Sequence, residues 1–197
     1  MASPTPTLLL LTIFFFISAS ADPDMLQDLC VADLSSGIKV NGFPCKDAAS
    51  VTSLDFFSQG LANPGLNTLG VSLSRIDYAP GGLNPPHTHP RATEVVFVLE
   101  GTLDVGFLTT ANRLISQSLK KGDVFAFPKG LVHFQKNNGK VPASVIAAFN
   151  SQLPGTQSLG ATLFGSTPPV PDNILAQAFQ TSPGTVKHIK TKFQPKK

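Results

Sequence analysis

The 197-residue chain is poor in helix-favouring residues and in charges of either sign. It contains only two glutamates and two methionines, and 14% of its residues are charged, whereas Val, Ile, Thr and Phe are plentiful. This balance argues against a helix bundle, because the scarce types favour helices and the abundant ones favour strands. A hydrophobic content of 42% also excludes a disordered chain. The composition predicts one compact β-rich domain.

Basic residues are scarce outside the last eleven positions. Five of the fifteen Lys and Arg residues lie there, and the rest of the chain carries ten basic against twelve acidic groups. No basic surface interleaved with aromatic residues is present, which argues against a nucleic-acid partner. We expect the basic tail to be solvated, with weak attraction to an anionic matrix such as an acidic polysaccharide as the alternative.

No apolar run is long enough to span a bilayer. The longest, residues 8–17 (LLLLTIFFFI), has ten residues and is followed by the small residues Ala19, Ser20 and Ala21. Residues 1–21 are therefore predicted to be a signal peptide, and an uncleaved anchor is the alternative because no Lys or Arg precedes the run. The mature chain is predicted to have no membrane span and to be secreted into the extracellular space.

Cysteine is limited to two residues, and there is no CxxC motif, which disfavours a cysteine metal or redox site. Cys30 and Cys45 are separated by fourteen residues and should pair in an oxidising compartment. Such a bridge would contribute about 3 kcal/mol by closing the loop. It would also fix an N-terminal arm to the rest of the fold.

Short alternating segments separated by turn signals dominate the middle of the chain. Their spacing of about ten residues is typical of an antiparallel barrel or jelly roll. Residues 80–86, rich in Pro and Gly, are expected to form a stiff loop. The predicted strands are Leu69–Ile76, Glu94–Leu99, Leu103–Leu108, Arg113–Leu119, Asp123–Phe127, Val132–Lys136 and Ala143–Phe149.

Helical patterns flank this region. A short helical turn is expected at Ser53–Phe57, and two amphipathic helices at Asn173–Phe179 and Gly184–Phe193, after a proline-rich linker. The last two have too little partner surface within one domain, so we expect them to pack on a neighbouring subunit. The predicted organisation is a signal peptide (1–21), an N-terminal arm (22–68), a barrel (69–165) and a helical extension (166–197).

Three of the four histidines fall in two short windows. His87 and His89 are two residues apart, which places both imidazoles on one face of a strand. Glu94 begins the next apolar run, where a carboxylate without a partner would be costly, and His133 lies among apolar residues. One divalent cation would satisfy all four groups at once, and chance polar residues in the core are the alternative.

The spacing of these residues resembles the cupin family. Gly81-x5-His87-x-His89-x4-Glu94-x6-Gly101 matches the first cupin motif, and Gly122-x5-Pro128-x-Gly130-x2-His133-x3-Asn137 matches the second. Residues 24–33, 81–94, 127–134 and 163–171 are similar to plant germins and germin-like proteins. The resemblance implies an all-β fold: a cupin jelly-roll β-barrel with a disulfide-pinned N-terminal arm and short C-terminal α-helices. It also implies a trimer of dimers in the apoplast, with manganese bound by His87, His89, Glu94 and His133.

The donor types agree with manganese. Three nitrogens and one oxygen, without thiolate, suit an octahedral ion that keeps two positions open, whereas structural zinc is normally closed by four ligands. Fe²⁺ is the alternative to Mn²⁺, because donor type alone does not separate them.

Two functions fit such a metal, and whether the protein is an enzyme stays open. One is an oxidoreductase of the superoxide dismutase type, linked to defence or stress, which needs only a small anion at an open position. The other is a non-catalytic, metal-stabilised cell-wall, receptor-like or storage binding protein. Oxalate oxidation is disfavoured: oxalate-oxidising germins use two asparagines, of which Asn84 matches one as a substrate contact, whereas Ser74 occupies the other position.

Three further features accompany the motifs. Arg91 is expected either to attract anions or to form a surface ion pair, and Asn137 to order a turn. Between Asp55 and Leu69 the chain is about twenty residues shorter than germin-like proteins, and a missing strand there would expose one barrel edge and put the dimer contact in doubt. A natural deletion and an error in the gene model both fit the shortening.

Overall fold

The computed structural model describes residues 27–57 and 64–193. The predicted signal peptide lies outside these residues, as does part of the shortened segment. Within the described ranges, no helix combines the length and the hydropathy needed to cross a membrane.

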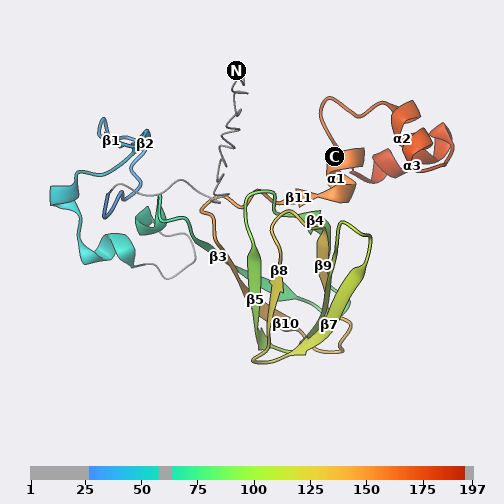
Figure 1. Ribbon diagram of the computed structural model, residues 1–197, viewed down its shortest axis with the longest axis horizontal. Helices are drawn as coiled ribbons and strands as arrows, with labels where there is room; N and C mark the ends of the chain where they lie inside the picture. Colours follow the sequence, from blue (N-terminus) through green and yellow to red (C-terminus); the bar gives the residue numbers. More distant parts are fainter. Residues whose placement is uncertain (1–26, 58–63, 194–197) are drawn as a thin grey trace, which may run out of the picture.

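Two antiparallel sheets form the barrel in the centre of the molecule (Figure 1). The first has the order β3 (Ser72–Tyr78), β10 (Ala143–Phe149), β5 (Glu94–Glu100) and β8 (Val124–Phe127). The second has the order β11 (Gln157–Ser158), β4 (Leu83–Thr88), β9 (His133–Lys136), β6 (Thr102–Leu108) and β7 (Leu114–Lys120). This architecture confirms the predicted all-β jelly roll.

Alternation along the strands determines which side chains fill the barrel. On β5, Glu94, Val96 and Val98 are buried, while Val95 and Phe97 are exposed. This period of two is what a sheet with one face toward a core requires. The resulting core is mainly valine, alanine and aromatic side chains, and Glu94 is the one charged residue on the inner face of β5.

One prediction in this region is wrong. The expected stiff loop at residues 80–86 is largely strand β4, in which Asn84 pairs with Gln135 and His87 pairs with His133. Its register shifts between Asn84 and His87, where Pro85 and Pro86 have no N–H to donate to the ladder. The prolines therefore interrupt the pairing without ending the strand. The first predicted strand also differs, because β3 runs from Ser72 to Tyr78.

The N-terminal arm is held by the predicted disulfide between Cys30 and Cys45, whose Cα atoms are 5.1 Å apart. A two-stranded ribbon lies inside the closed loop, and the expected helical turn after it is confirmed as 3-10 helix η2. The arm elements are β1 (Lys39–Val40), β2 (Phe43–Pro44), η1 (Ala48–Ser50), η2 (Ser53–Phe56) and η3 (Pro64–Leu66).

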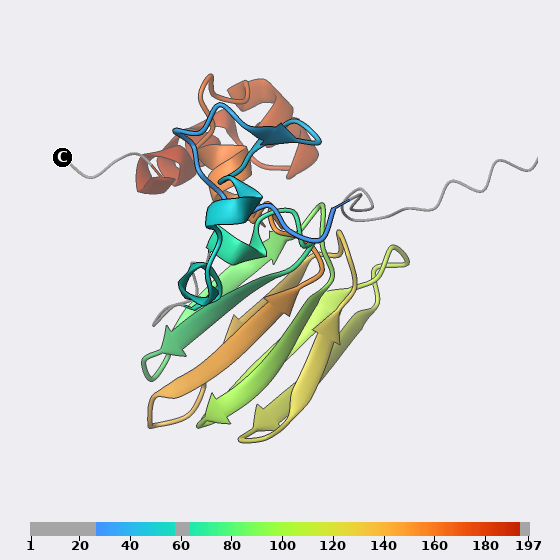
Figure 2. The same ribbon diagram turned by 90° about the vertical axis from the view of Figure 1, so that its left-hand side faces the viewer.

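The C-terminal extension contains both predicted helices, α2 (Asp172–Ala178) and α3 (Pro183–Phe193). A further short helix, α1 (Leu159–Phe164), was not predicted. Leu175 and Val186 form a small core separate from the barrel. The arm and this extension project from opposite sides of one end of the barrel (Figure 1), and Figure 2 shows both above the same end. The boundaries between arm, barrel and extension stay predictions.

Candidate metal centre

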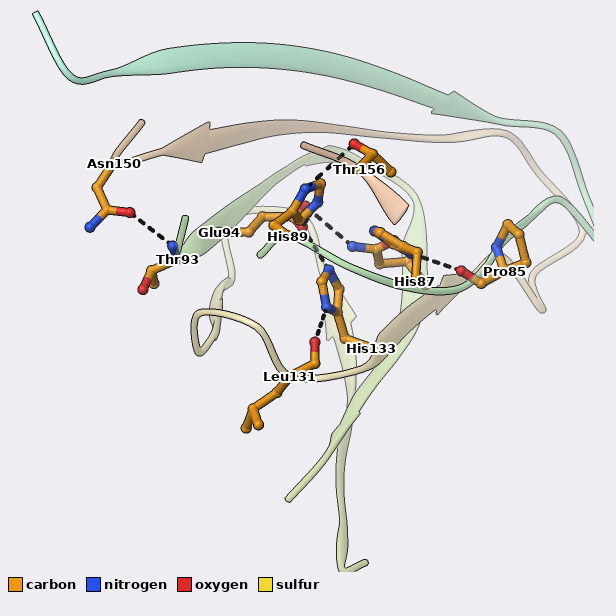
Figure 3. Close-up of polar contacts among 10 residues, drawn as sticks. Pro85, His87, His89, Thr93, Glu94, Leu131, His133, Asn150 and Thr156 are labelled. Atoms are coloured by element: carbon orange, nitrogen blue, oxygen red, sulfur yellow. Dashed lines mark hydrogen bonds and ion pairs between the residues drawn. The ribbon is translucent and has the colours of Figure 1, made fainter. Parts of the chain in front are cut away.

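Three strands bring the four predicted ligands together (Figure 3). His87 lies on β4 and His89 just beyond its end, Glu94 begins β5, and His133 begins β9. Their exposed fractions are 1%, 4%, 1% and 1%, respectively. One nitrogen of each histidine and one carboxylate oxygen of Glu94 all lie within 4.8 Å of one another. Four such groups in one buried space could hold a single metal ion.

The Nδ1 atom of each imidazole, which points away from the centre of the cluster, contacts an oxygen. His87 Nδ1 lies 2.8 Å from the carbonyl oxygen of Pro85, and His133 Nδ1 lies 2.8 Å from that of Leu131. His89 Nδ1 is 3.4 Å from the hydroxyl of Thr156. A carbonyl can only accept, so His87 and His133 donate from Nδ1, which leaves Nε2 with a free lone pair in the neutral ring. This arrangement is typical of metal-binding histidines, whose second nitrogen is fixed by an outer partner.

The carboxylate of Glu94 faces two of these Nε2 atoms. Its Oε2 lies 2.9 Å from His133 Nε2 and 3.1 Å from His89 Nε2. Burial raises the pKa of this carboxyl, but in the metal-free site hydrogen bonds from His133 and His89, whose Nε2 atoms then carry a proton, outweigh burial and lower it to about 2. Glu94 is therefore ionised at neutral pH. Oxygen and nitrogen lone pairs at this separation repel each other unless a proton or a metal ion lies between them.

His87 is held in its neutral form. Burial lowers its pKa to about 4, although the hydrogen bond to the carbonyl of Pro85 opposes this shift. Metal ligation requires a neutral imidazole. The protein environment thus disfavours the protonated ring that would compete with a metal ion.

Aromatic rings surround the cluster. Phe127 stacks on His133 with ring centroids 4.5 Å apart, and Phe149 meets His89 edge-on at 4.8 Å. Phe125 continues this wall, 5.1 Å from Phe127. Phe127 and Phe149 therefore line the site, and their apolar rings strengthen electrostatic interactions inside it.

The two positions linked to oxalate oxidation both face the barrel interior. Asn84 is half-buried and in register with the buried Gln135. Ser74 is half-buried, alternates with exposed neighbours on β3 and pairs with Ala147 of β10. Ser74 therefore lies on the inner face of β3, the face on which a side chain could contact a ligand in the barrel. Its hydroxyl is shorter than an amide and has fewer donors.

Two other residues were given roles from the sequence. Asn137 orders a turn, as expected: its Nδ2 donates to the carbonyl of Val141 at 2.8 Å, and its Oδ1 accepts from Gly139 N–H. Arg91 is exposed and donates from Nε to the carbonyl oxygen of Leu153 at 2.6 Å. Among the described residues it forms no ion pair, so its charge is not neutralised by a carboxylate neighbour.

Sequence reasoning missed two polar residues of this region. Gln135 donates from Nε2 to Glu94 Oε1 at 3.3 Å and is fully buried. Its position two residues after His133 on a strand was a usable signal, because both side chains share one face. Thr156 approaches His89 from a distant loop, so its role has no local signal.

Comparison with known proteins places the chain in a family. The sequence profile of the Cupin family matches residues 58–187. "Germin-like protein subfamily 2 member 1" of Arabidopsis thaliana is 84% identical over 219 aligned positions that span 100% of both chains. This chain has 197 residues, so 22 of those positions have no counterpart in it, which agrees with the expected shortening.

Two further relatives bear on function. "Rhicadhesin receptor" of Pisum sativum is 63% identical over 88% of this chain and 89% of its own length. A solved structure of oxalate oxidase aligns with a TM-score of 0.81 and 44% identity over 87% of this chain and 98% of that chain. Together with the buried four-residue donor set, this similarity implies a metal cofactor. The profile match and the identities show that the chain belongs to the germin-like proteins of the cupin superfamily.

Proposed function

We propose that His87, His89, Glu94 and His133 bind one Mn²⁺ ion and that the protein is a secreted oxidoreductase of the superoxide dismutase type. The observation that carries this proposal is the convergence of three imidazole nitrogens and one ionised carboxylate in the buried interior of the barrel. Four ligands leave two positions open on an octahedral ion, and oxygen and nitrogen donors without sulfur suit manganese. Fe²⁺ is the alternative ion.

When bound, manganese supplies the one-electron redox chemistry that converts two superoxide anions and two protons to dioxygen and hydrogen peroxide. The protein's own residues prepare the site for this chemistry. Backbone carbonyls orient His87 and His133, and the rings of Phe127 and Phe149 limit the entry of water. The guanidinium of Arg91, two residues after His89, forms no ion pair with any described residue and attracts small anions.

Oxalate oxidation is the less favoured reaction for this site, despite the similarity to oxalate oxidase. A dicarboxylate needs groups that hold its second carboxylate. Asn84 supplies one of the two amides, but Ser74 stands in place of the other, so the set of groups that would bind oxalate is incomplete.

A non-catalytic binding role is the second candidate, favoured by the 63% identity to the rhicadhesin receptor. In this case the metal would stabilise the fold and the ligand would bind elsewhere, with an acidic cell-wall polysaccharide at the basic tail as one partner.

The decisive experiment compares superoxide consumption by metal-replete wild type and by His89→Ala. The matched control is His188→Ala, which removes the exposed histidine of α3. We expect wild type and His188→Ala to consume superoxide and His89→Ala to lose both metal and activity. Equal consumption by wild type and His89→Ala, or one zinc ion per chain without turnover, would favour the binding role. The same three proteins are also tested for consumption of oxalate.

We also propose export to the apoplast and assembly into a homo-oligomer, as a trimer of dimers. Large apolar side chains on the arm and the extension support assembly: Leu34, Phe57 and Phe179 are 91%, 64% and 52% exposed. Such surface is costly for a monomer in water. Light scattering on the purified protein measures the mass, and a monomeric mass would contradict the proposal.

A further inference from the structure

His89 is the one proposed metal ligand that lies outside a strand. His87, Glu94 and His133 belong to β4, β5 and β9, and each pairs with a neighbouring strand, so the ladders fix their backbones. His89 follows the last residue of β4, in the short loop that leads to Glu94. Its carbonyl oxygen accepts from the N–H of Gly130 at 3.1 Å, but the direction of the imidazole depends on what holds the loop.

The strap, residues 150–156, runs along this loop and is fastened to it by Arg91. The Arg91 N–H donates to the carbonyl of Pro154 at 3.3 Å, and Arg91 Nε donates to that of Leu153 at 2.6 Å. The guanidinium also packs on the backbone of Gly155, where an added Cβ would lie 2.6 Å from Arg91 Cζ. Glycine, here with φ +72°, therefore makes room for the arginine.

Figure 3 shows two further contacts of the strap, one at each end. At its start, the N–H of Thr93 donates to Asn150 Oδ1 at 2.8 Å. At its end, the hydroxyl of Thr156 lies 3.4 Å from His89 Nδ1. A hydroxyl can accept a hydrogen bond from Nδ1, which leaves the lone pair of Nε2 for a metal ion.

The outer partner of His89 differs in kind from those of the other two imidazoles. His87 and His133 contact backbone carbonyls at 2.8 Å, each two residues earlier in the same segment. Thr156 instead offers an exposed side chain from a segment that is distant in sequence. The position of this hydroxyl, and with it the orientation of His89, therefore depends on how the strap is fastened.

We propose that Arg91 and Thr156 are positioning residues for His89: Arg91 fastens the strap, and the strap holds the Thr156 hydroxyl against Nδ1. The inference rests on the metal binding in the proposed function and is independent of the dismutase reaction. It gives Arg91 a role that has the opposite sign to its charge. The positive guanidinium repels a metal cation, so its removal alone would strengthen metal binding or leave it unchanged, whereas release of the strap weakens it.

Mn²⁺ affinity, measured by competition with a chelator, tests the inference on wild type and three variants. Arg91→Ala and Thr156→Val should each bind Mn²⁺ about tenfold or more weakly, as is typical when the outer partner of a metal ligand is lost. Thr156→Ser keeps the hydroxyl and should bind Mn²⁺ as wild type does. The matched control is Arg75→Ala, which removes an exposed arginine paired with Asp77 on β3 and should leave the affinity unchanged.

Two further measurements separate positioning from a general loss of stability. The absorption spectrum of bound Co²⁺ reports the geometry of the ligands, and it should change in Thr156→Val but not in Thr156→Ser. Combining Arg91→Ala with Thr156→Val should cost less affinity than the sum of the two single effects, because a released strap has already lost the Thr156 contact. Thr156 is exposed, so its substitution should not disturb folding, and its variants carry the test if Arg91→Ala does not fold.

Several results would overturn the inference. They are equal or tighter Mn²⁺ binding by Arg91→Ala, wild-type affinity in Thr156→Val, no rescue by Thr156→Ser, and an equal loss in Arg75→Ala. Superoxide assays on wild type separate this outcome from that of the proposed function. If affinity depends on the strap but wild type consumes no superoxide, the positioning roles stand and the dismutase proposal fails. If wild type consumes superoxide and the variants bind Mn²⁺ as it does, the reverse holds, and a wild type that binds no Mn²⁺ contradicts both.

Discussion

Acidification of the metal-free protein should destabilise it well before its carboxylates are protonated, because His87 is buried in its neutral form. The pKa of His87 is about 4 in the folded protein, against 6.5 for an ordinary histidine. Between these two pH values the unfolded chain binds a proton that the folded chain does not. The stability is therefore complete above pH 6.5 and decreases as the pH falls toward 4. The difference corresponds to about 3 kcal/mol, a large part of a typical domain's stability.

Glu94 extends the effect at lower pH. Its pKa is about 2 in the folded protein against 4.5 ordinarily, so its contribution is present above pH 4.5 and is lost as the pH falls further toward 2. The loss between pH 6.5 and 4.5 thus belongs mainly to His87, and the loss below pH 4.5 to Glu94 as well.

Urea unfolding at a series of pH values, in the presence of a chelator, measures this dependence. His87→Gln should flatten the profile between pH 6.5 and 4, whereas His188→Gln, which removes an exposed histidine, should leave it unchanged. With manganese bound, acidification should also release the metal, because protons and metal compete for the same nitrogen lone pairs. A metal-free stability that does not change between pH 7 and 4, or an unaltered profile in His87→Gln, would refute the reasoning.

Three further substitutions have definite expected effects. Cys30→Ser combined with Cys45→Ser should lower the free energy of unfolding by about 3 kcal/mol, because a bridge across 15 positions is lost; equal unfolding curves would contradict this. Phe127→Ala should cost about 3–5 kcal/mol in calorimetry and weaken metal binding, because the ring is buried and stacks on His133; metal affinity equal to wild type would show that the stacking does not position His133. Gly101→Ala should destabilise by more than about 1 kcal/mol, since Gly101 has φ +74° and an added Cβ would lie 2.8 Å from Ala143 Cα. A stable Gly101→Ala would mean that the turn after β5 can rearrange.

The convergence of these four side chains was predictable because it follows from local rules. Two histidines separated by one residue share a strand face, and a glutamate at the start of an apolar strand needs a partner. The match to the second cupin motif then identified His133 as the fourth residue, although 39 positions separate it from Glu94. Figure 3 shows the four side chains pointing toward one another.

Other parts of the fold depend on contacts that local patterns do not encode. Strand β4 was assigned to a loop because two adjacent prolines argue against a ladder, yet Leu83, Asn84 and His87 still pair with β9. Helix α1 is six residues long and lacks a polar face that would mark it as amphipathic. Thr156 reaches His89 through a loop 67 positions away. Tyr78 was missed because the alternating pattern was ended at Ile76, one buried position too early.

The central claim is that three imidazoles and one carboxylate from separate strands bind one ion. Anomalous diffraction from crystals of the manganese-loaded protein at the manganese absorption edge tests it most directly. We expect a single strong peak per chain within bonding distance of Nε2 of His87, His89 and His133 and of the Glu94 carboxylate. No peak among these four groups, or His133 turned away from the other three, would contradict it.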